Sequence, residues 1–361
     1  MTSYLTSAFP PQQYDMLTTP KIMWGTALAV LPSVGWGIYQ YGTPAFALVG
    51  TTLFVAILAE LLFSMLLNRG SLADGNGVMI GLLLAAAFPP GTPIYAAAAA
   101  TLFSMAVIKW TFGGTGSYWV NPIAGGYVFA VVSFPSFGGS WMLPRLLGGP
   151  SEGYQAPLQL LTGASVESAT RLGEAYYRLA PHGTTPLDEQ VTRLINNVGG
   201  EFLGVRIPAG YADLFLGNVP SSIGGASVAL LLLGSVFLLG RTIISSVIPF
   251  FFLTSFSLLI YLLGGLPYGA PLFTGDILFH LTTGGAILGA LFVATETVSA
   301  PLTTPGMVVY GILAGVLAAL LRLFGDGVHA VMLAILLANM VVPLVDRYTM
   351  PRLYGSGRGA G

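Results

Sequence analysis

The chain has 361 residues, of which 54% are hydrophobic and only 7% are charged, and its formal net charge is −1. Because a soluble domain carries about a quarter charged residues, this composition predicts an integral protein of a lipid bilayer, and no basic tract suggests nucleic-acid binding. Cysteine is absent, which excludes disulfides, thiolate metal sites and cysteine-ligated iron–sulfur clusters from this chain.

Hydrophobic runs predict about ten transmembrane helices, since a spanning helix needs about 20 mostly apolar residues. They are residues 22–41, 45–67, 76–89, 92–111, 119–135, 221–240, 242–264, 277–295, 305–323 and 327–346. The third, fifth and eighth are short or interrupted by Gly and Pro, which indicates broken or half-spanning helices. The predicted fold class is therefore an all-α polytopic membrane protein.

The two halves of the chain carry the same motifs in the same order. GVMIGLLLAAAFPP begins at Gly77 and FGGTG at Phe112, whereas GAILGALFVATETV begins at Gly285 and FGDG at Phe324. This order favours two repeats of five helices over a coincidence among Gly-rich apolar segments. Because five is odd, the second repeat must be inverted in the membrane.

Basic residues predict the orientation of the helices. With ten helices, Arg322 and the mixed-charge segment 136–220 fall on one side of the membrane. The basic residues of the short loops and of the tail fall on the opposite side, at Lys21, Arg69, Lys109, Arg241, Arg347, Arg352 and Arg358. Since cytoplasmic loops carry the excess of Lys and Arg, both termini are expected in the cytoplasm. The predicted organisation is a first membrane repeat (1–135), an extracytoplasmic segment (136–220), a second membrane repeat (221–346) and a cytoplasmic tail (347–361).

Four long motifs resemble those of one protein family. They are ADGNGVMIGLLLAAAFPP at 73–90, KWTFGGTGSYWVNPIAGGYVFAVVSFP at 109–135, ATETVSAPLTTPG at 294–306 and ILLANMVVPLVDRYTMPRLYG at 335–355. Together they resemble the RnfD/NqrB family: the D subunit of the Rnf complex and, more distantly, the B subunit of the sodium-pumping NADH:quinone reductase. The resemblance covers nearly the whole chain.

The resemblance implies a covalently bound flavin. In that family an FMN is joined through its phosphate to a Thr that ends the pattern Asp-x-x-Ser/Thr-Gly/Ser/Ala-Ala-Thr. Ser168, Ala169 and Thr170 match the end of this pattern, whereas Ala164 and Glu167 stand where Asp and Ser or Thr are usual. Thr170 is thus the expected phosphothreonyl-FMN site, loaded by a flavin transferase, and ordinary polar loop residues are the alternative. The family also implies a second, non-covalent flavin, riboflavin or FMN, between the helices.

By the same resemblance, the chain is expected to be an electron-transfer subunit of a ferredoxin:NAD oxidoreductase that translocates Na⁺ or H⁺ across a bacterial or archaeal cytoplasmic membrane. It would not be a complete enzyme and has no predicted catalytic residue, because other Rnf-type subunits carrying flavins and iron–sulfur clusters would bind the soluble substrates. The alternative is a stand-alone inverted-repeat channel or transporter for a small solute, since the repeat architecture alone fits solute passage equally well.

Polar residues at membrane depth are candidate ion-coupling sites, because a charge near the bilayer centre costs about 2.5–3.5 kcal/mol. Glu60 lies deepest, within the second helix, whereas Asp74, Asn121 and Glu296 lie near breaks or ends of other helices. Two interpretations of Glu60 remain open. It binds a cation or a proton, or it only forms a hydrogen bond between helices or extends toward the membrane surface. His280 has no second ligand nearby, so we expect a hydrogen-bonded helix histidine and no metal site.

Overall fold

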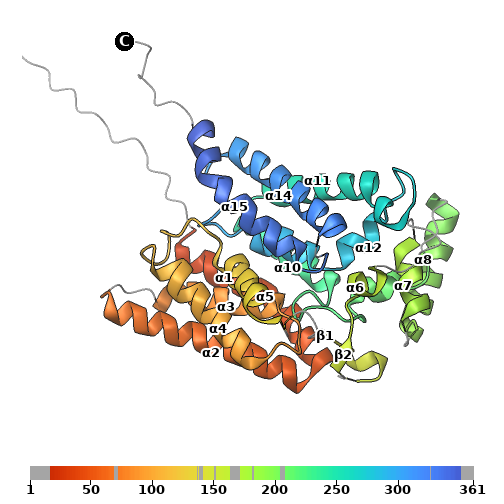
Figure 1. Ribbon diagram of the computed structural model, residues 1–361, viewed down its shortest axis with the longest axis horizontal. Coiled ribbons are helices and arrows are strands. Elements are labelled where there is room, and N and C mark those ends of the chain that lie inside the picture. The colour runs from red at the N-terminus through yellow and green to blue at the C-terminus, as the bar shows by residue number, and fades with distance from the viewer. Residues whose placement is uncertain are drawn as a thin grey trace, which may run out of the picture.

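The structure of the chain is a computed structural model (Figure 1). It describes residues 17–68, 72–135, 137, 141–149, 152–162, 171–180, 183–203, 208–325 and 327–350. Most of these residues are helical, and their one sheet is the antiparallel pair of β1 (Trp141–Met142) and β2 (Glu152–Tyr154). In Figure 1 the helices of the first half, red to yellow, lie below those of the second half, cyan to blue.

Among the described residues, five helices are long and apolar enough to cross a membrane. They are α1 (Thr19–Tyr41), α2 (Thr43–Leu66), α11 (Val247–Leu263, followed by η6, Leu266–Tyr268), α14 (Thr304–Phe324) and α15 (Ala330–Thr349). Large apolar side chains such as Phe46, Leu66 and Phe250 are exposed on them. Helices that are apolar on every face are typical of membrane spans, and the prediction of a polytopic helical membrane protein is confirmed.

Several shorter apolar helices complete the bundle. They are α3 (Asn76–Ala87), α4 (Ile94–Phe103) with the π-helix η2 (Ser104–Trp110), α5 (Pro122–Ser133), α10 (Val228–Gly240), and α12 (Ile277–Thr282), which is followed by α13 (Ala286–Leu288) and the π-helix η7 (Gly289–Val293). At 1.5 Å per residue, α3 is roughly 18 Å long, which is well short of the roughly 30 Å hydrocarbon core. The third, fifth and eighth predicted elements are therefore short or broken, as expected.

The sixth helix begins later than predicted, at Val228. The preceding stretch instead lies against the end of α3, where the Ile223 N–H donates to the Phe88 carbonyl (3.0 Å) and the Gly224 N–H to the Ala86 carbonyl (2.8 Å). A helix that ends within a membrane needs its last carbonyl groups bonded inside the protein, because lipid offers no donor. Hydropathy alone cannot reveal this use of non-helical backbone.

The break between α12 and α13 is closed by Arg322 of α14. Its Nη1 donates to the carbonyl groups of His280 (2.5 Å) and Thr283 (3.0 Å), and its Nη2 donates to that of Gly284 (2.6 Å). The turn uses Gly284 and Gly285 at φ of 59° and 67°, a left-handed conformation that glycine adopts without steric cost. Both interrupted elements, α3 and α12–α13, thus obtain partners for the backbone groups that the interruption leaves free.

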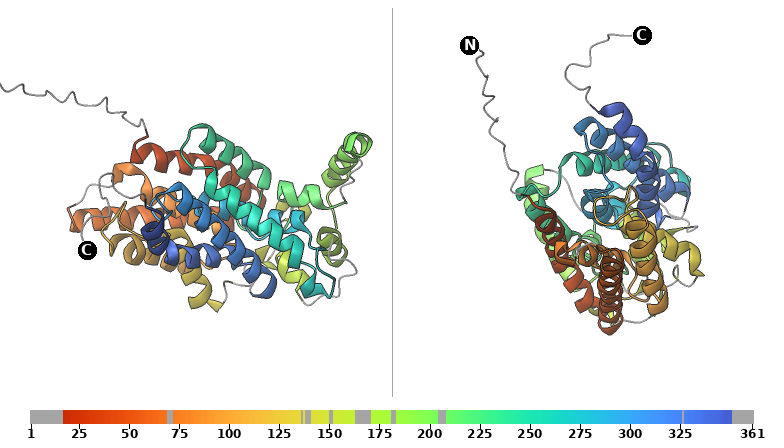
Figure 2. Two further views of the ribbon diagram at one scale, coloured as in Figure 1. Left: turned by 90° about the horizontal axis from the view of Figure 1, so that it is seen from above. Right: turned by 90° about the vertical axis from the view of Figure 1, so that its left-hand side faces the viewer.

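A small helical unit follows the first half and lies at one end of the bundle (Figures 1 and 2). It comprises η4 (Arg145–Leu147), α6 (Pro157–Leu161), α7 (Leu172–Leu179), α8 (Pro186–Leu203) and α9 (Tyr211–Leu216), besides β1 and β2. Trp141, Leu161, Leu172 and Tyr176 share a hydrophobic cluster with Phe279 of α12. The unit is therefore packed directly on the broken eighth element.

Gly37 in α1 lets the stretch around Ile223 lie directly on that helix. A Cβ atom on Gly37 would overlap the Ile223 carbonyl oxygen, whereas a Cβ atom on Gly35 would meet nothing within 4 Å. We expect Gly37→Ala to lower the free energy of unfolding of the detergent-solubilised chain by about 1–3 kcal/mol, as overpacking does. Gly35→Ala is the matched control and should melt like the wild type; equal melting temperatures of the two variants would contradict this reading.

Candidate functional site

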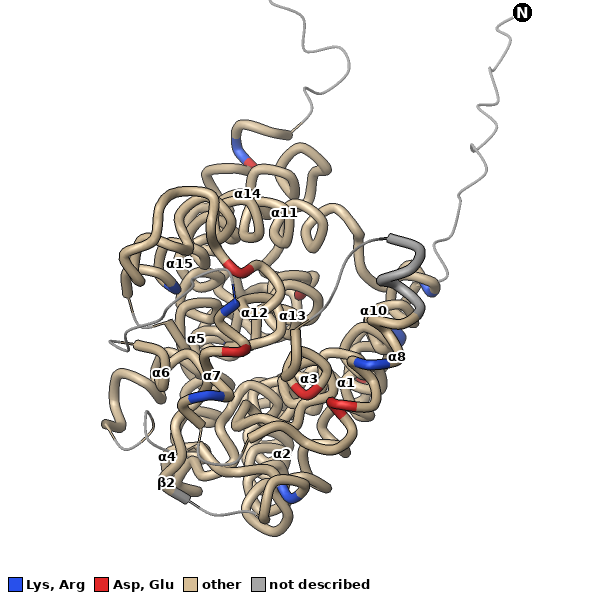
Figure 3. Tube along the Cα trace, turned by 90° about the vertical axis from the view of Figure 1, so that its right-hand side faces the viewer, with Lys and Arg blue, Asp and Glu red and all other residues tan. Residues whose placement is uncertain are grey.

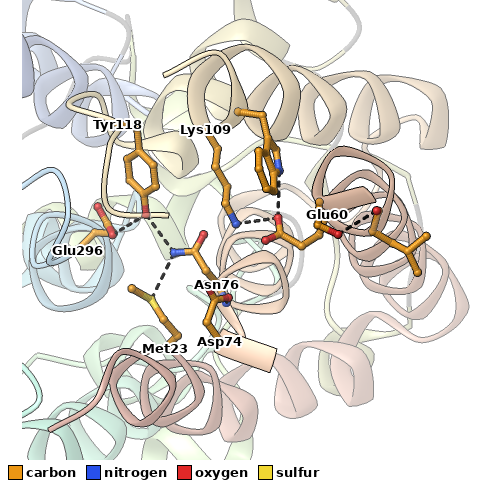
Figure 4. Close-up of polar contacts among 10 residues, drawn as sticks. Met23, Glu60, Asp74, Asn76, Lys109, Tyr118 and Glu296 are labelled. Carbon is orange, nitrogen blue, oxygen red and sulfur yellow. Dashed lines mark hydrogen bonds and ion pairs between the residues drawn. The ribbon is translucent and has the colours of Figure 1, made fainter. Parts of the chain in front are cut away.

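A buried ion pair joins α2 and η2. Lys109 Nζ lies 2.7 Å from Glu60 Oε2, and the two side chains are 0% and 4% exposed. Figure 4 shows Lys109 pointing toward Glu60. The Trp110 indole N–H donates to the same carboxylate oxygen at 3.2 Å. Charged positions are few along the bundle (Figure 3), and here the cost of burying a carboxylate is offset by an opposite charge and two hydrogen bonds.

The position of Lys109 corrects the sequence analysis, which placed this residue among the basic groups at the membrane surface. Lys109 belongs to the π-helix η2, whose wider turn changes which side chains face inward, and both Lys109 and Trp110 are buried. An isolated Lys in one apolar segment and an isolated Glu in another are the signal that could have suggested the pair.

A second chain of polar groups links the two halves. Asn76 Nδ2 donates to the Tyr118 hydroxyl oxygen (3.1 Å), and the Tyr118 hydroxyl donates to Glu296 Oε1 (2.9 Å) (Figure 4). The other Glu296 oxygen accepts hydrogen bonds from the N–H and the hydroxyl of Ser299, at 2.9 and 2.8 Å. All four residues are buried, so this network of hydrogen bonds holds a buried carboxylate just after η7.

Three of the four predicted coupling residues, Glu60, Asp74 and Glu296, gather around the start of α3. Asp74 accepts a hydrogen bond from the Asn76 N–H at 3.1 Å. A Cβ atom on Gly77 would lie 3.3 Å from the Cβ of Glu60, so the ion pair adjoins the polar chain that leads to Glu296. The sequence analysis missed Asn76 as a link, because one amide in an apolar helix carries no distinctive signal.

Asn121 instead holds the N-terminus of α5. Its Oδ1 accepts hydrogen bonds from the N–H groups of Ile123 (2.9 Å) and Ala124 (3.1 Å), and its Nδ2 donates to the Val293 carbonyl (2.7 Å) at the end of η7. Pro122 follows at the first helical position, where its missing N–H costs nothing. Asn121 therefore caps one short helix and ties it to the broken element of the other half.

Thr170, which is predicted to carry the flavin, lies outside the described part of the chain, as do Ser168 and Ala169, which match the same pattern. The chain that follows them is bonded to the start of α12, because the Leu172 N–H donates to Asp276 Oδ2 at 2.9 Å.

Asp276 is the anchor for this chain. The Tyr211 hydroxyl donates to its Oδ2, and the Phe279 N–H donates to its Oδ1 at 3.0 Å. Burial raises the pKa of the Asp276 carboxyl above its usual range, although the N–H of Phe279, the Tyr211 hydroxyl and the N–H of Leu172 each lower that pKa. One carboxylate thus caps α12 and fixes the start of α7.

A cavity of about 790 Å³ is lined in part by His280 of α12, the helix that Asp276 caps. We call it the Arg322 cavity; β2, α6, η6, α12 and α14 contribute to its wall, with Tyr154, Thr162, Tyr268, His280 and Arg322 among the lining residues. Thr162 ends α6, immediately before the stretch that carries Thr170. The chain therefore enters that stretch from the cavity wall.

His280 differs from its prediction. Within the described residues, neither ring nitrogen of this buried histidine has a hydrogen-bond partner, and the same holds for Nε of Arg322. The expectation that the His280 ring is hydrogen-bonded is therefore wrong as far as the described residues are concerned. The sequence analysis also missed Arg322 as a site residue, although an arginine near the end of an apolar helix is the signal that could have identified it.

Known proteins are similar to this chain over nearly its full length. The sequence model of the NQR2, RnfD, RnfE family matches residues 6–355. The chain belongs to this family. It is 30% identical over 339 residues to the D subunit of the proton-translocating ferredoxin:NAD(+) oxidoreductase complex of Clostridium ljungdahlii, covering 94% of this chain and 92% of the relative.

Two further relatives are D subunits of complexes named as ion-translocating oxidoreductases. The chain is 34% identical over 345 residues to the one from Stutzerimonas stutzeri, covering 93% of this chain and 92% of the relative. It is 33% identical over 363 residues to the D subunit from Yersinia pseudotuberculosis serotype O:1b, and the match covers 98% of this chain and 99% of the relative. The family resemblance of the four motifs is thus confirmed.

Asp276→Asn should release the start of α7. Both oxygens of the Asp276 carboxylate accept hydrogen bonds, and in either orientation of the asparagine amide one of them is replaced by an NH₂ group, which cannot accept. We expect a local loss of about 1–3 kcal/mol, as for unpaired buried groups. The side chain of Arg171 is 62% exposed just before this anchor, so trypsin should cleave after it faster than in the wild type.

The matched control is Glu174→Gln, which removes the 3.7 Å ion pair between the partly buried Glu174 and the exposed Arg171. Such a pair contributes little, so this variant should be cleaved at the wild-type rate. An unchanged cleavage rate in Asp276→Asn would show that the carboxylate does not anchor α7.

Proposed function

We propose that this chain is the D subunit of an ion-translocating ferredoxin:NAD⁺ oxidoreductase complex of the Rnf type, and that it carries electrons on an FMN joined to Thr170 by a phosphoester. The observation that carries the proposal is similarity over more than nine-tenths of the chain to relatives named as D subunits of such complexes. Without cysteine the chain has no thiolate ligands for iron–sulfur clusters, so partner subunits supply those centres and a flavin transferase loads the FMN.

The described residues on either side of the stretch with Thr170 are compatible with a bound flavin. Thr162 on one side of the stretch lines the Arg322 cavity, and Leu172 on the other side is fixed to Asp276. The volume of about 790 Å³ falls within the roughly 300–1,000 Å³ of typical ligand pockets. When bound, the FMN supplies the electron-transfer chemistry, while residues of this chain hold and shield it.

The second, non-covalent flavin does not fit the cavity between the broken elements. That cavity, lined by Ala87, Tyr127, Gly285 and Met332 among others, has a volume of about 30 Å³. This is roughly a tenth of the smallest typical ligand pockets. We therefore assign no step of electron transfer to a flavin in this cavity.

An inverted pair of repeats, over residues 1–135 and 221–346, accounts for the packing of the bundle. The N-cap residues of α3 and α13, Gly75 and Gly285, are both left-handed, with φ of 76° and 67°. Helix α1 packs against α10, and α5 packs against α15, which are the first and last helices of the two halves. Contacts between equivalent helices are what a pseudo-two-fold axis in the membrane plane would produce.

We place both termini in the cytoplasm and residues 136–220 outside. Lys109 no longer supports this orientation, because it is buried, whereas Lys21, Arg241 and Arg347 are exposed on the described helices near the expected cytoplasmic side. Arg69, Arg352 and Arg358 lie outside the described residues, together with most of the tail.

A reporter that is active only outside the cell should stay inactive when it is fused after Gly361. The matched fusion after Gly183, in the segment between the halves, should be active. The reverse pattern of reporter activity in whole cells would overturn the proposed orientation.

Thr170→Ala should abolish covalent flavin while the chain still inserts into the membrane, because an alanine offers no hydroxyl for the phosphoester. In-gel flavin fluorescence of the denatured chain and its intact mass, after co-expression with the transferase, measure this. Ser168→Ala, two residues away, is the matched control and should keep the flavin. Covalent flavin that persists in Thr170→Ala would refute the assignment, and no flavin in the wild type would favour the stand-alone transporter.

We further propose that Glu60 supports ion coupling together with Asp74 and Glu296. The charge of Glu60 inside an apolar helix requires a second buried charge, that of Lys109, to compensate it. A pair of well-packed apolar residues of similar volume is often as stable as a buried ion pair, so stability alone does not explain this pair. The adjoining chain through Asn76 and Tyr118 offers a polar route between the three carboxylates.

Glu60→Gln should give a complex that assembles with its flavins and loses ion-dependent turnover, since glutamine accepts hydrogen bonds but carries no charge. The single variant leaves Lys109 unpaired, which costs about 3–5 kcal/mol, so its defect could be one of folding. The double variant Glu60→Gln/Lys109→Met removes both charges and resolves this. If it restores stability without ion transport, coupling is supported; if it restores ion transport, the pair serves only packing.

A further inference from the structure

The Arg322 cavity contains a buried cation that has no carboxylate partner within the described part of the chain. Arg322 is 4% exposed, and the ion pairs found there join other residues. Its ring-face contact is with Phe256, with Cζ 5.2 Å from the ring centroid. A charge buried in this way is costly unless an anion or several acceptors compensate it.

Part of the compensation is structural. The two Nη atoms of Arg322 donate to the carbonyl groups of His280, Thr283 and Gly284, which end α12 and form the break. A cation at the C-terminal end of a short helix is favourable for the same reason. These carbonyl groups satisfy the Nη atoms, but Nε of Arg322 has no acceptor among the described residues.

His280 adds a second, independent indication of a ligand. It lines the same cavity, is 1% exposed, and has no hydrogen-bond partner on either ring nitrogen within the described residues. Buried polar groups of this kind are normally satisfied, since each unmade hydrogen bond costs about 1–3 kcal/mol. Two neighbouring unsatisfied groups, one cationic, on a cavity of ligand size indicate an anionic or acceptor-rich ligand.

We infer that the Arg322 cavity holds the ring system of the flavin attached to Thr170, with the Arg322 guanidinium and the His280 imidazole as its polar contacts. The inference rests on the proposed function. The flavin starts near the cavity: Thr170 is two residues before Leu172, which is fixed to Asp276, and Asp276 is one helical turn from His280. Thr162 brings the other side of the stretch to the cavity wall.

The charge of Arg322 then acts on the reduction potential of the flavin. A flavin ring reduced by two electrons and one proton carries one additional negative charge, and a fixed positive charge beside it favours that state. Burial strengthens the effect, because little water screens the charge. Through this contact Arg322 raises the midpoint potential of the flavin, and His280 orients the ring through a hydrogen bond.

The test uses the full chain co-expressed with the flavin transferase, with covalent attachment verified by intact mass. Arg322→Lys keeps the charge, Arg322→Gln removes it, and His280→Phe removes both ring nitrogens while keeping a planar ring. Arg241→Gln is the control, because Arg241 is an exposed arginine at the end of α10, away from the lining residues of the cavity. Two quantities are measured: the midpoint potential of the bound flavin, and the quenching of its fluorescence by iodide.

In the wild type, iodide should quench the bound flavin much less than free FMN, because the ring is shielded in the cavity. Arg322→Gln should disfavour the reduced flavin at least tenfold, which is about 30 mV for a two-electron couple. Arg322→Lys and Arg241→Gln should stay near the wild-type potential, and His280→Phe should increase quenching. A merely structural arginine would change the melting temperature of Arg322→Gln but not the potential.

The failures of the two proposals are distinguishable. Flavin present on Thr170 but quenched by iodide like free FMN, or an unchanged potential in folded Arg322→Gln, overturns the cavity inference and leaves the attachment site standing. Absence of flavin from Thr170 in the wild type overturns the proposed function and the inference with it. If Arg322→Gln does not fold, His280→Phe and the wild-type quenching decide the question.

Discussion

The fold depends on one constraint: helices that stop inside a membrane must have their free backbone groups bonded by protein. The structure meets it with three different donors. Backbone N–H groups at Ile223 and Gly224 bond the end of α3, Arg322 bonds the end of α12, and Asn121 bonds the end of η7. Each donor comes from the other half of the chain or from a neighbouring helix, so the short elements are stable only in the assembled bundle.

The same constraint concentrates polar chemistry where the helices break. Asn76 lies at the start of α3, Tyr118 in the loop before α5 and Glu296 just after η7, and these three are joined by hydrogen bonds. Arg322 bonds the backbone at the end of α12, where His280 lies. An apolar helix can carry such groups only where a protein partner or a ligand satisfies them. The breaks are therefore where these buried polar groups find partners that an apolar helix alone does not offer.

Hydropathy and Gly/Pro punctuation were sufficient to predict every apolar helical element, including the half-length α3 and the broken α12–α13. They could not place side chains around a helix axis. Lys109 was therefore assigned to the surface, although η2 turns it inward to Glu60. The late start of α10 depends on hydrogen bonds to residues more than a hundred positions away, which no local pattern encodes.

The candidate flavin site shows the complementary limit. Thr170 was found from a family pattern, whereas the neighbouring cavity residues Arg322 and His280 come from α14 and α12 and share no motif with it. A charged residue in an apolar segment predicts that a partner exists but not which one. Only the packing of α6 and α7 on α12 brings Leu161 and Leu172, which flank the stretch with Thr170 in the sequence, close to α12.

The most direct measurement of the central claim is a tryptic peptide map of the chain isolated after co-expression with its flavin transferase. Cleavage after Arg145 and Arg171 yields one peptide, residues 146–171, that contains Thr162, Ser168 and Thr170. The account predicts that this peptide gains the mass of FMN less one water, and that fragmentation places the gain on Thr170. An unmodified peptide, or a flavin on any other residue, would contradict it.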